Sequence, residues 1–198
     1  MKHIFLLLST AVCLLTACNN NKKPGVTVTS KDGKKTTTIQ PNELAKVSED
    51  FQKKTEDLEK LSPYTLDQMK ALLPEELAGA KRSKFSANSA MGAAYAEAEY
   101  PINDSVLLEL KIFDCAGQAG AGIYNLQYLG LMNFQSESDD EFTRIFEFNG
   151  GRAVEHHDKK NNHSTLTYLA GDRLLVTLEG RKTGMDVLKQ AAGSLRLK

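Results

Sequence analysis

The most apolar strand-like segment of the chain is Val106-Leu107-Leu108-Glu109-Leu110-Lys111-Ile112. Side chains of an extended chain point alternately to opposite faces, so Val106, Leu108, Leu110 and Ile112 share one face. Glu109 and Lys111 lie on the other face. This alternation predicts a β-strand with one buried face, and the apolar content of that face predicts a position near the centre of a sheet.

Other strands are predicted before and after this segment. Before it, Ala94, Ala96 and Ala98 alternate with larger polar residues, which predicts a strand with a small-residue inner face. After it, four more strands are predicted, at about Phe142–Phe148, Arg152–His157, Ser164–Leu169 and Arg173–Glu179. The gaps between these four are short, which is typical of hairpins and therefore of an antiparallel meander.

Helical periodicity marks four other segments. The longest begins at Pro41-Asn42 and reaches about Leu61, with apolar residues at spacings of three and four (Leu44, Val47, Phe51, Leu58, Leu61). Thr65 and Gln68 form a capping-box pattern that opens a short second helix. A third helix is expected after the Gly/Ala run at residues 115–122, and a fourth over Met185–Leu195.

The order of these elements predicts an α+β fold. We expect an antiparallel sheet of about six strands, with helices packed mainly on one face and the other face partly exposed to water. Upstream, Val26–Thr29 and Thr36–Ile39 flank Asp32-Gly33, which favours a hairpin. A helical N-terminal arm at residues 41–84 then precedes the α+β domain at residues 85–198.

The N-terminus has the pattern of a secretory signal peptide. Lys2 and His3 precede an apolar run from Ile4 to Leu15. That run is too short to cross a bilayer core of about 30 Å, which needs about 20 residues. A basic start, a short apolar run and a small-residue end together predict a cleaved leader.

The end of this leader is Leu15-Thr16-Ala17-Cys18. It resembles the lipobox of bacterial lipoproteins, in which a leucine and two small residues precede the cysteine. The resemblance implies removal of residues 1–17, diacylglycerol on the Cys18 sulfur and a further acyl chain such as palmitate. Two or more acyl chains are needed for stable anchoring to the bilayer. The alternatives are an ordinary signal peptide with a chance cysteine, or a buried N-terminal helix.

The residue after Cys18 bears on which membrane holds the anchor. Asn19 replaces the aspartate that keeps lipoproteins of enteric-type bacteria at the inner membrane. The resemblance therefore favours the outer membrane, facing the periplasm. Residues 18–40 form a polar lipidated tether that carries the hairpin.

Charge argues against a nucleic-acid partner. Residues 1–17 contain one lysine and no acidic residue, so the remaining 181 residues carry 24 basic and 25 acidic side chains. Nucleic-acid binding would call for a basic face. The partners expected are the lipid bilayer, through acylated Cys18, and an envelope protein or small ligand.

Cysteine usage leaves one free thiol. Cys13 leaves with the leader and Cys18 is lipidated, so Cys115 has no partner for an intramolecular disulfide. A cysteine between a strand and a helix N-terminus could be an activated nucleophile. The favoured interpretation is a small buried side chain, because free cysteine is among the most buried residue types.

The histidine-rich hairpin is the candidate metal site. If the turn centres on Lys160, His157 and His163 lie directly opposite each other, and Asp158 or Glu155 could add a carboxylate. Imidazole and carboxylate are common zinc ligands. A slip of one residue would send one imidazole to the opposite face, and the alternative is a solvated hairpin tip.

Two further patterns contain residues that could carry chemistry. The Gly-rich run Gly117–Gly122 could cradle phosphate, but it lacks the Gly-Lys-Ser/Thr ending of a P-loop, and close helix packing explains it better. Glu97, Glu99 and Glu109 share the polar face of the sheet and could in principle divide acid and base roles. Exposed strand faces carry such residues routinely.

The leading hypothesis is an envelope lipoprotein that is a non-enzymatic binding module for a protein or small ligand, without a cofactor. The alternative is a metal-dependent enzyme that uses the His157/His163 hairpin, with a divalent metal such as zinc as the cofactor. A third is a structural spacer that docks through the helix at Asn42–Leu61.

Overall fold

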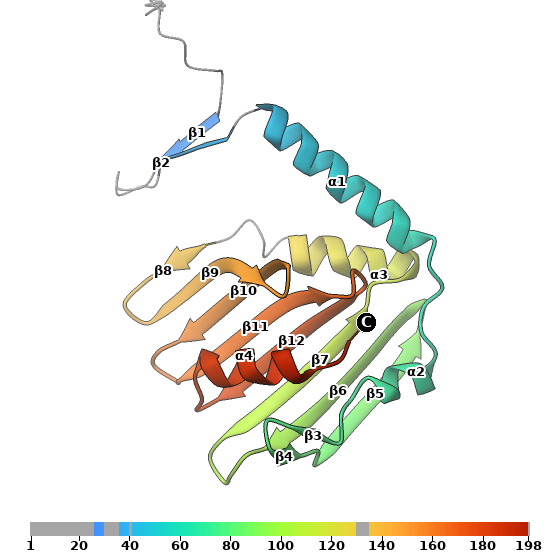
Figure 1. Ribbon diagram of the computed structural model, residues 1–198, viewed down its shortest axis with the longest axis vertical. Coiled ribbons are helices and arrows are strands. Elements are labelled where there is room, and N and C mark those ends of the chain that lie inside the picture. The colour runs from blue at the N-terminus through green and yellow to red at the C-terminus, as the bar shows by residue number, and fades with distance from the viewer. Residues whose placement is uncertain (1–25, 30–35, 40, 130–134, 198) are drawn as a thin grey trace, which may run out of the picture. The chain divides into compact units, whose positions relative to one another are not determined.

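The computed structural model describes residues 26–29, 36–39, 41–129 and 135–197 (Figure 1). The chain divides into two units, residues 1–48 and 49–198. In the first unit, β1 (Val26–Thr29) pairs antiparallel with β2 (Thr36–Ile39), as the hairpin pattern predicts. The Asp32-Gly33 turn, the leader and Cys18 lie outside the described residues, so their interpretation stays a prediction.

The boundary between the two units falls within helix α1 (Pro41–Glu59), whose side chains are described from Glu49 onward. Only Leu58 of this part is buried, and Phe51 is half-buried. Within the second unit, the Thr55 hydroxyl lies 2.9 Å from the Asn125 side chain, and Lys54 lies 3.2 Å from Asp172. None of the helices described is both long and apolar enough to cross a membrane.

The second unit is built on an eight-stranded antiparallel sheet in the order β5-β6-β7-β12-β11-β10-β9-β8 (Figure 1). Its strands are β5 (Lys84–Ala90), β6 (Ala93–Pro101), β7 (Leu107–Asp114), β8 (Ser136–Glu137), β9 (Glu141–Phe148), β10 (Gly151–Asp158), β11 (His163–Ala170) and β12 (Leu174–Arg181). After β7 the chain passes through α3 (Gly117–Ile123) and the π-helical segment η1 (Tyr124–Leu129) to the far edge. It then returns strand by strand until β12 pairs with β7.

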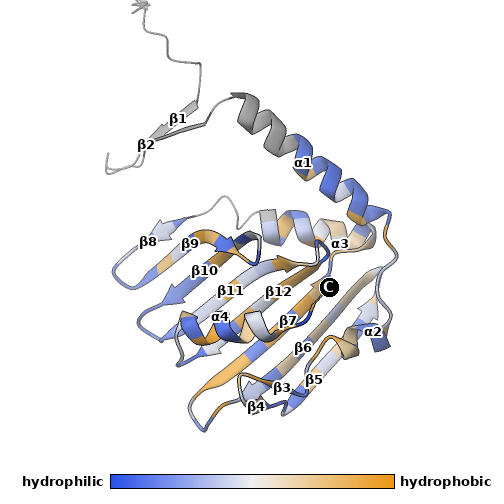
Figure 2. Cartoon of the chain, in the orientation of Figure 1, coloured by the Kyte–Doolittle hydropathy of each residue, from blue (hydrophilic) through white to orange (hydrophobic). Residues whose placement is uncertain are grey.

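The centre of the sheet lies where the sequence predicts it. Leu108, Leu110 and Ile112 of β7 are fully buried, and Leu110 is directly opposite Leu178 of β12. Figure 2 shows hydrophobic colour on much of these two strands and hydrophilic colour on most of the C-terminal half of α1. The alternation of apolar and polar residues along β7 therefore predicts correctly which side chains are buried.

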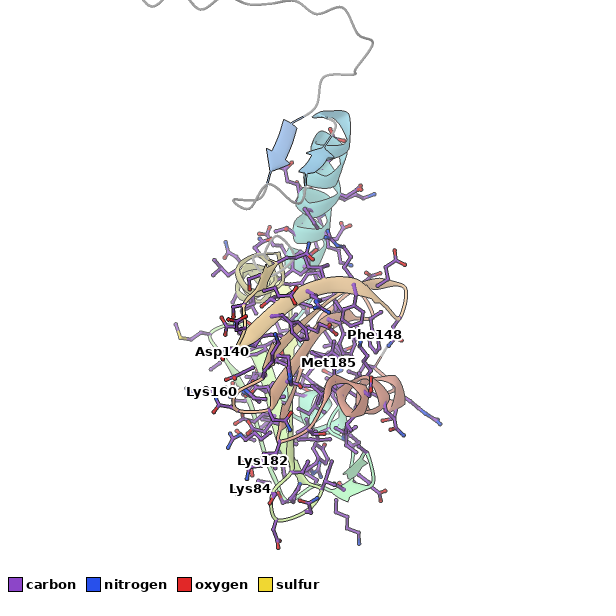
Figure 3. The ribbon with its side chains drawn as sticks, turned by 90° about the vertical axis from the view of Figure 1, so that its left-hand side faces the viewer. Lys84, Asp140, Phe148, Lys160, Lys182 and Met185 are labelled. Carbon is purple, nitrogen blue, oxygen red and sulfur yellow. The ribbon has the colours of Figure 1, made fainter. Side chains whose placement is uncertain are left out.

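We call the face that carries these leucines the inner face; Phe148 and Met185 lie on this side of the sheet and Lys84 on the other (Figure 3). Helix α2 (Leu66–Ala71) packs on it near β5 and β6, and α4 (Met185–Ser194) lies across β11 and β12 (Figure 1). The predicted capping box of α2 is present, with Thr65 and Gln68 bonding reciprocally. Gly180 allows α4 to lie close, because a Cβ built there would be 2.5 Å from the Thr183 side chain and 3.0 Å from Leu188. A two-residue hairpin, β3 (Glu76–Leu77) with β4 (Ala80–Lys81), completes this side.

The opposite, outer face is covered at one end only by the described helices. There α3, η1 and the end of α1 enclose a second, smaller core. Its buried members are Leu58, Cys115, Ala121, Tyr124, Tyr128, Val154 and Leu175. Gly120 brings α3 close to the end of β7, since a Cβ built there would lie 2.5 Å from the Cys115 carbonyl carbon.

The α+β class and the antiparallel sheet are confirmed, whereas two details differ from the prediction. Eight strands replace six, because β5 consists mainly of small residues with no alternation of burial, and β8 is only two residues long. Helices also pack on both faces, because the apolar end of the outer face at Phe113, Leu169 and Leu175 needs a cover.

Candidate functional site: the uncovered outer sheet face

The register of the β10–β11 hairpin moves the predicted metal ligands apart. Asp158 pairs with His163, and His157 pairs with Ser164, so the expected pairing of His157 with His163 is wrong by one residue. Because adjacent residues of a strand face opposite ways, His157 lies on the inner face and His163 on the outer face. Within the described ranges, no three His, Cys, Asp or Glu side chains gather closely enough to hold a metal ion.

Turn chemistry explains this register. The Asp158 carboxylate accepts hydrogen bonds from the Asn161 backbone N–H (3.0 Å) and from its side-chain amide (2.5 Å), which lower the pKa of Asp158. Asn162 adopts the left-handed conformation with φ of 48°. Asparagine tolerates this conformation better than most residues, so the four-residue loop closes at Asp158 rather than at His157.

His157 takes part in a structural hydrogen-bond chain. Its Nδ1 lies 2.9 Å from the Ser164 Oγ, and the buried Ser164 hydroxyl donates to the Thr183 carbonyl at 3.0 Å. Because the serine has only one hydroxyl proton, the His157 Nδ1–H must be the donor in the first bond. The proton direction is the reverse of that in a serine nucleophile activated by histidine.

Cys115 is fully buried, which confirms its interpretation as a small core residue. Burial raises the pKa of its thiol to about 12. Its backbone N–H donates to the Arg173 carbonyl at 3.0 Å. The thiol is therefore protonated at neutral pH and shielded from solvent reagents.

The uncovered part of the outer face carries a row of three glutamates. Glu99 of β6 is directly opposite Glu109 of β7, and Glu109 is directly opposite Glu179 of β12. We call these three residues the glutamate row. Glu97 lies on the same face, one pair along, where it is opposite Lys111. The sequence places Glu97, Glu99 and Glu109 together but gives no reason to add Glu179, which is 70 residues from Glu109.

Cations are distributed along the glutamate row. The Lys111 Nζ lies 2.6 Å from Glu179 and 3.8 Å from Glu109, and its side chain is only 28% exposed. Arg181 contacts Glu109 at 2.5 Å, and Lys84 contacts Glu99 at 3.2 Å. The Lys84 side chain is 75% exposed, so the two ends of this network differ in how firmly their cations are held.

A histidine also reaches the row. The His163 Nε2 lies 3.8 Å from the Glu179 carboxylate, which is too far for a hydrogen bond. This nitrogen atom is buried and has no hydrogen-bond partner among the described residues. His163 therefore contributes no fixed bond to the row.

Two hollows lie on this face and meet at Lys111. The first has a volume of about 230 Å³ and is lined by Lys84, Ser86, Glu97, Glu99, Glu109 and Lys111, among others. The second has a volume of about 430 Å³ and lies against η1, where Phe113 and Leu126 provide an apolar wall. The two hollows give the face a charged part and an apolar part.

Aromatic residues set the position of Glu97. The Tyr95 hydroxyl donates a short hydrogen bond to the Glu97 carboxylate. Burial, followed by this carboxylate, raises the pKa of Tyr95. The Tyr95 ring packs on Phe113 with 4.5 Å between ring centroids.

No protein-family model, curated protein or solved structure matches the chain. The residues of the outer face therefore provide the basis for a functional hypothesis.

Proposed function

We propose that the protein is a lipid-anchored lipoprotein of the outer membrane, facing the periplasm, and that it acts as a non-enzymatic binding module. The proposed anchor is acylated Cys18. The proposed binding surface is the glutamate row with its two hollows. The observation that supports this surface most directly is the alignment of three carboxylates across neighbouring strands, on the part of the sheet that the described helices leave uncovered.

The charge balance of this surface favours a ligand with positively charged groups. Four carboxylates (Glu97, Glu99, Glu109, Glu179) face three cations (Lys84, Lys111, Arg181). Neighbouring strands lie about 4.8 Å apart, so the outer two glutamates of the row are separated by about 10 Å at the backbone. A peptide or polyamine with two amines at such a spacing could contact both ends.

The exposed cations are the ones a ligand would displace. The Arg181 side chain is 62% exposed, and Lys84 is more exposed still. Exposed ion pairs contribute at most about 1 kcal/mol, so exchanging either partner for a ligand amine costs little. Lys111 is held more firmly and keeps the central part of the row neutralised.

A titration with trilysine tests the binding surface. The full chain in non-ionic detergent is titrated with trilysine, and chemical shifts are followed by NMR. We expect shifts at β6, β7 and β12 that weaken as salt is added, because charge attraction between exposed groups is screened. The Glu97→Gln/Glu99→Gln variant should bind trilysine at least several-fold more weakly.

The control variant is Glu76→Gln, which removes an exposed carboxylate from β3, away from the glutamate row. It should bind trilysine as the wild type does, and triglutamate should bind neither protein. Equal binding of trilysine by all three proteins, or shifts elsewhere on the molecule only, would contradict the proposed surface.

A further inference from the structure

Strand β5 forms one long edge of the sheet. Among the described strands it pairs with β6 alone, from Lys84 opposite Glu99 to Ala90 opposite Ala93 (Figure 1). Every residue of β5 is exposed except Ala87, which is half-buried. A strand in this position presents a row of backbone N–H and C=O groups to any strand that approaches.

β5 lacks the devices that usually protect an edge strand. It has no proline, its register with β6 is unbroken by a bulge, and its only charged residue is Lys84 at its start. Proteins commonly block exposed edges with prolines, bulges or inward-pointing charges. The absence of all three over seven residues of β5 points to an edge that is paired in the working protein.

We propose that β5 pairs antiparallel with β5 of a second copy of this chain, on a two-fold axis through Ala87. In this register Ser86 lies opposite Asn88 of the second copy, and Phe85 lies opposite Ser89. Residues opposite each other in antiparallel strands point to the same face, so both inner faces lie on one side of the joined sheet. The interface is isologous, as in most dimers.

The side chains of β5 are self-complementary in this register. Ser86 and Asn88 can hydrogen-bond across the junction on the outer face. The two copies of Lys84 lie opposite Ala90 at the two ends of the pairing, about 20 Å apart at about 3.3 Å per residue, so they do not repel each other appreciably. The centre of the pairing is uncharged.

The inner face has room for the second copy beside Phe85. This side chain is 54% exposed, with the Arg82 guanidinium 4.8 Å from its ring centroid. A hollow of about 560 Å³ lies next to it, between β5 and the end of α2, with Leu73 and Pro74 among its lining residues. The small Ser89 and Ala87 side chains of the second copy would fit against Phe85 there and cover it.

Charge substitution at the junction tests the pairing. The full chain with Cys18→Ala, which lacks the thiol predicted to be acylated, is measured by sedimentation equilibrium over a range of concentrations. Wild-type β5 should give a concentration-dependent dimer. In the Ser86→Lys/Asn88→Lys variant, two lysines of each copy face two lysines of the other, and the dimer should be lost.

Three controls test whether loss of the dimer comes from charge repulsion in the proposed register and not from unfolding. Ser86→Lys alone places each new lysine opposite Asn88, so it should retain most of the dimer. Mixing the double-lysine variant with Ser86→Glu/Asn88→Glu should restore a one-to-one dimer. Unchanged thermal unfolding shows that each variant is folded. A wild-type chain that stays monomeric at the highest concentration, or a double-lysine variant that still dimerises, would overturn the proposal.

Discussion

Asp114 and Arg173 form a bidentate salt bridge. The arginine Nε lies 2.7 Å from Oδ1 of the carboxylate, and Nη2 lies 2.8 Å from Oδ2. Asp114 is fully buried and also accepts from the backbone N–H groups of Tyr64 (2.6 Å) and Ala116 (3.1 Å). The guanidinium lies 3.7 Å from the Tyr64 ring centroid and donates to the Ser62 carbonyl. One ion pair thus joins β7, the start of α3 and the α1–α2 connection, and the Asp114 carboxylate raises the pKa of Arg173.

Removing the arginine should therefore destabilise the whole domain. Arg173→Met leaves the buried Asp114 carboxylate without its counter-ion, and breaking a buried pair in this way costs about 3–5 kcal/mol. Urea unfolding followed by circular dichroism measures the loss. The control is Lys54→Met, which breaks a pair with the 89% exposed Asp172 and should cost no more than about 1 kcal/mol. Equal effects of the two variants would contradict this account.

Two glycines of α3 should respond oppositely to alanine. Gly120→Ala places a methyl group 2.5 Å from the Cys115 carbonyl carbon and 2.6 Å from the Asp114 carbonyl oxygen, both of which are backbone atoms. We expect the free energy of unfolding to fall by about 1–3 kcal/mol. Gly122→Ala meets nothing within 4 Å and should stabilise the helix by about 0.5–1 kcal/mol. In thermal unfolding, Gly120→Ala should melt at a lower temperature than the wild type, and Gly122→Ala at a higher one.

Alkaline pH should weaken the fold. Burial raises the pKa of Cys115 from 9.0 to about 12, and it raises those of Tyr100, Tyr124 and Tyr168 from 10.0 to about 12. Below pH 9 these groups are protonated in both folded and unfolded chains, so their contribution to stability is fully present. Between about pH 9 and 12 the unfolded chain ionises first, and the free energy of unfolding falls. Urea midpoints at pH 8, 10 and 11 should decrease in that order, and a flat profile would contradict the burial of these groups.

The buried thiol should also be unreactive. At pH 8 iodoacetamide should modify Cys115 slowly in the folded protein and rapidly in urea, because the thiolate is the nucleophile and access is blocked. Mass spectrometry of tryptic peptides follows the rate. Rapid modification without denaturant would show that the α3 cover opens readily.

The predicted anchor can be tested by metabolic labelling. Cells given radiolabelled palmitate should incorporate it into the wild-type chain and not into Cys18→Ala, and only the wild type should sediment with the membranes. If neither protein carried label and both remained in the soluble fraction, the proposed envelope location would be wrong.

Strands whose two faces differ in polarity were predictable from the sequence. Burial of one face imposes a period of two on β6 and β7. The bounds of β7 and of β9 to β12 agree with the prediction to within about two residues. The sequence of β5 shows no such pattern, because an edge strand buries little side-chain surface and most of its residues are small. Propensity alone does not identify such a strand.

The site was less predictable than the fold because it depends on register and strand order. A four-residue loop rather than a five-residue one is enough to separate His157 from His163. Glu179 joins Glu109 only because β12 returns to pair with β7, a neighbour that sequence separation does not indicate. Both facts come from tertiary pairing and not from local composition.

The pairing of β7 with β12 also determines when the sheet can finish folding during synthesis. Among the described strands of the sheet, β12 is the last to be synthesised, yet it lies in the middle of the sheet. Until residue 181 has left the ribosome, β7 is an apolar strand with one unpaired edge, and such an edge is prone to aggregation. The native core therefore cannot be completed before β12 has been synthesised, and any truncation before β12 should leave two separate half-sheets, β5-β6-β7 and β11-β10-β9-β8, instead of a shortened protein.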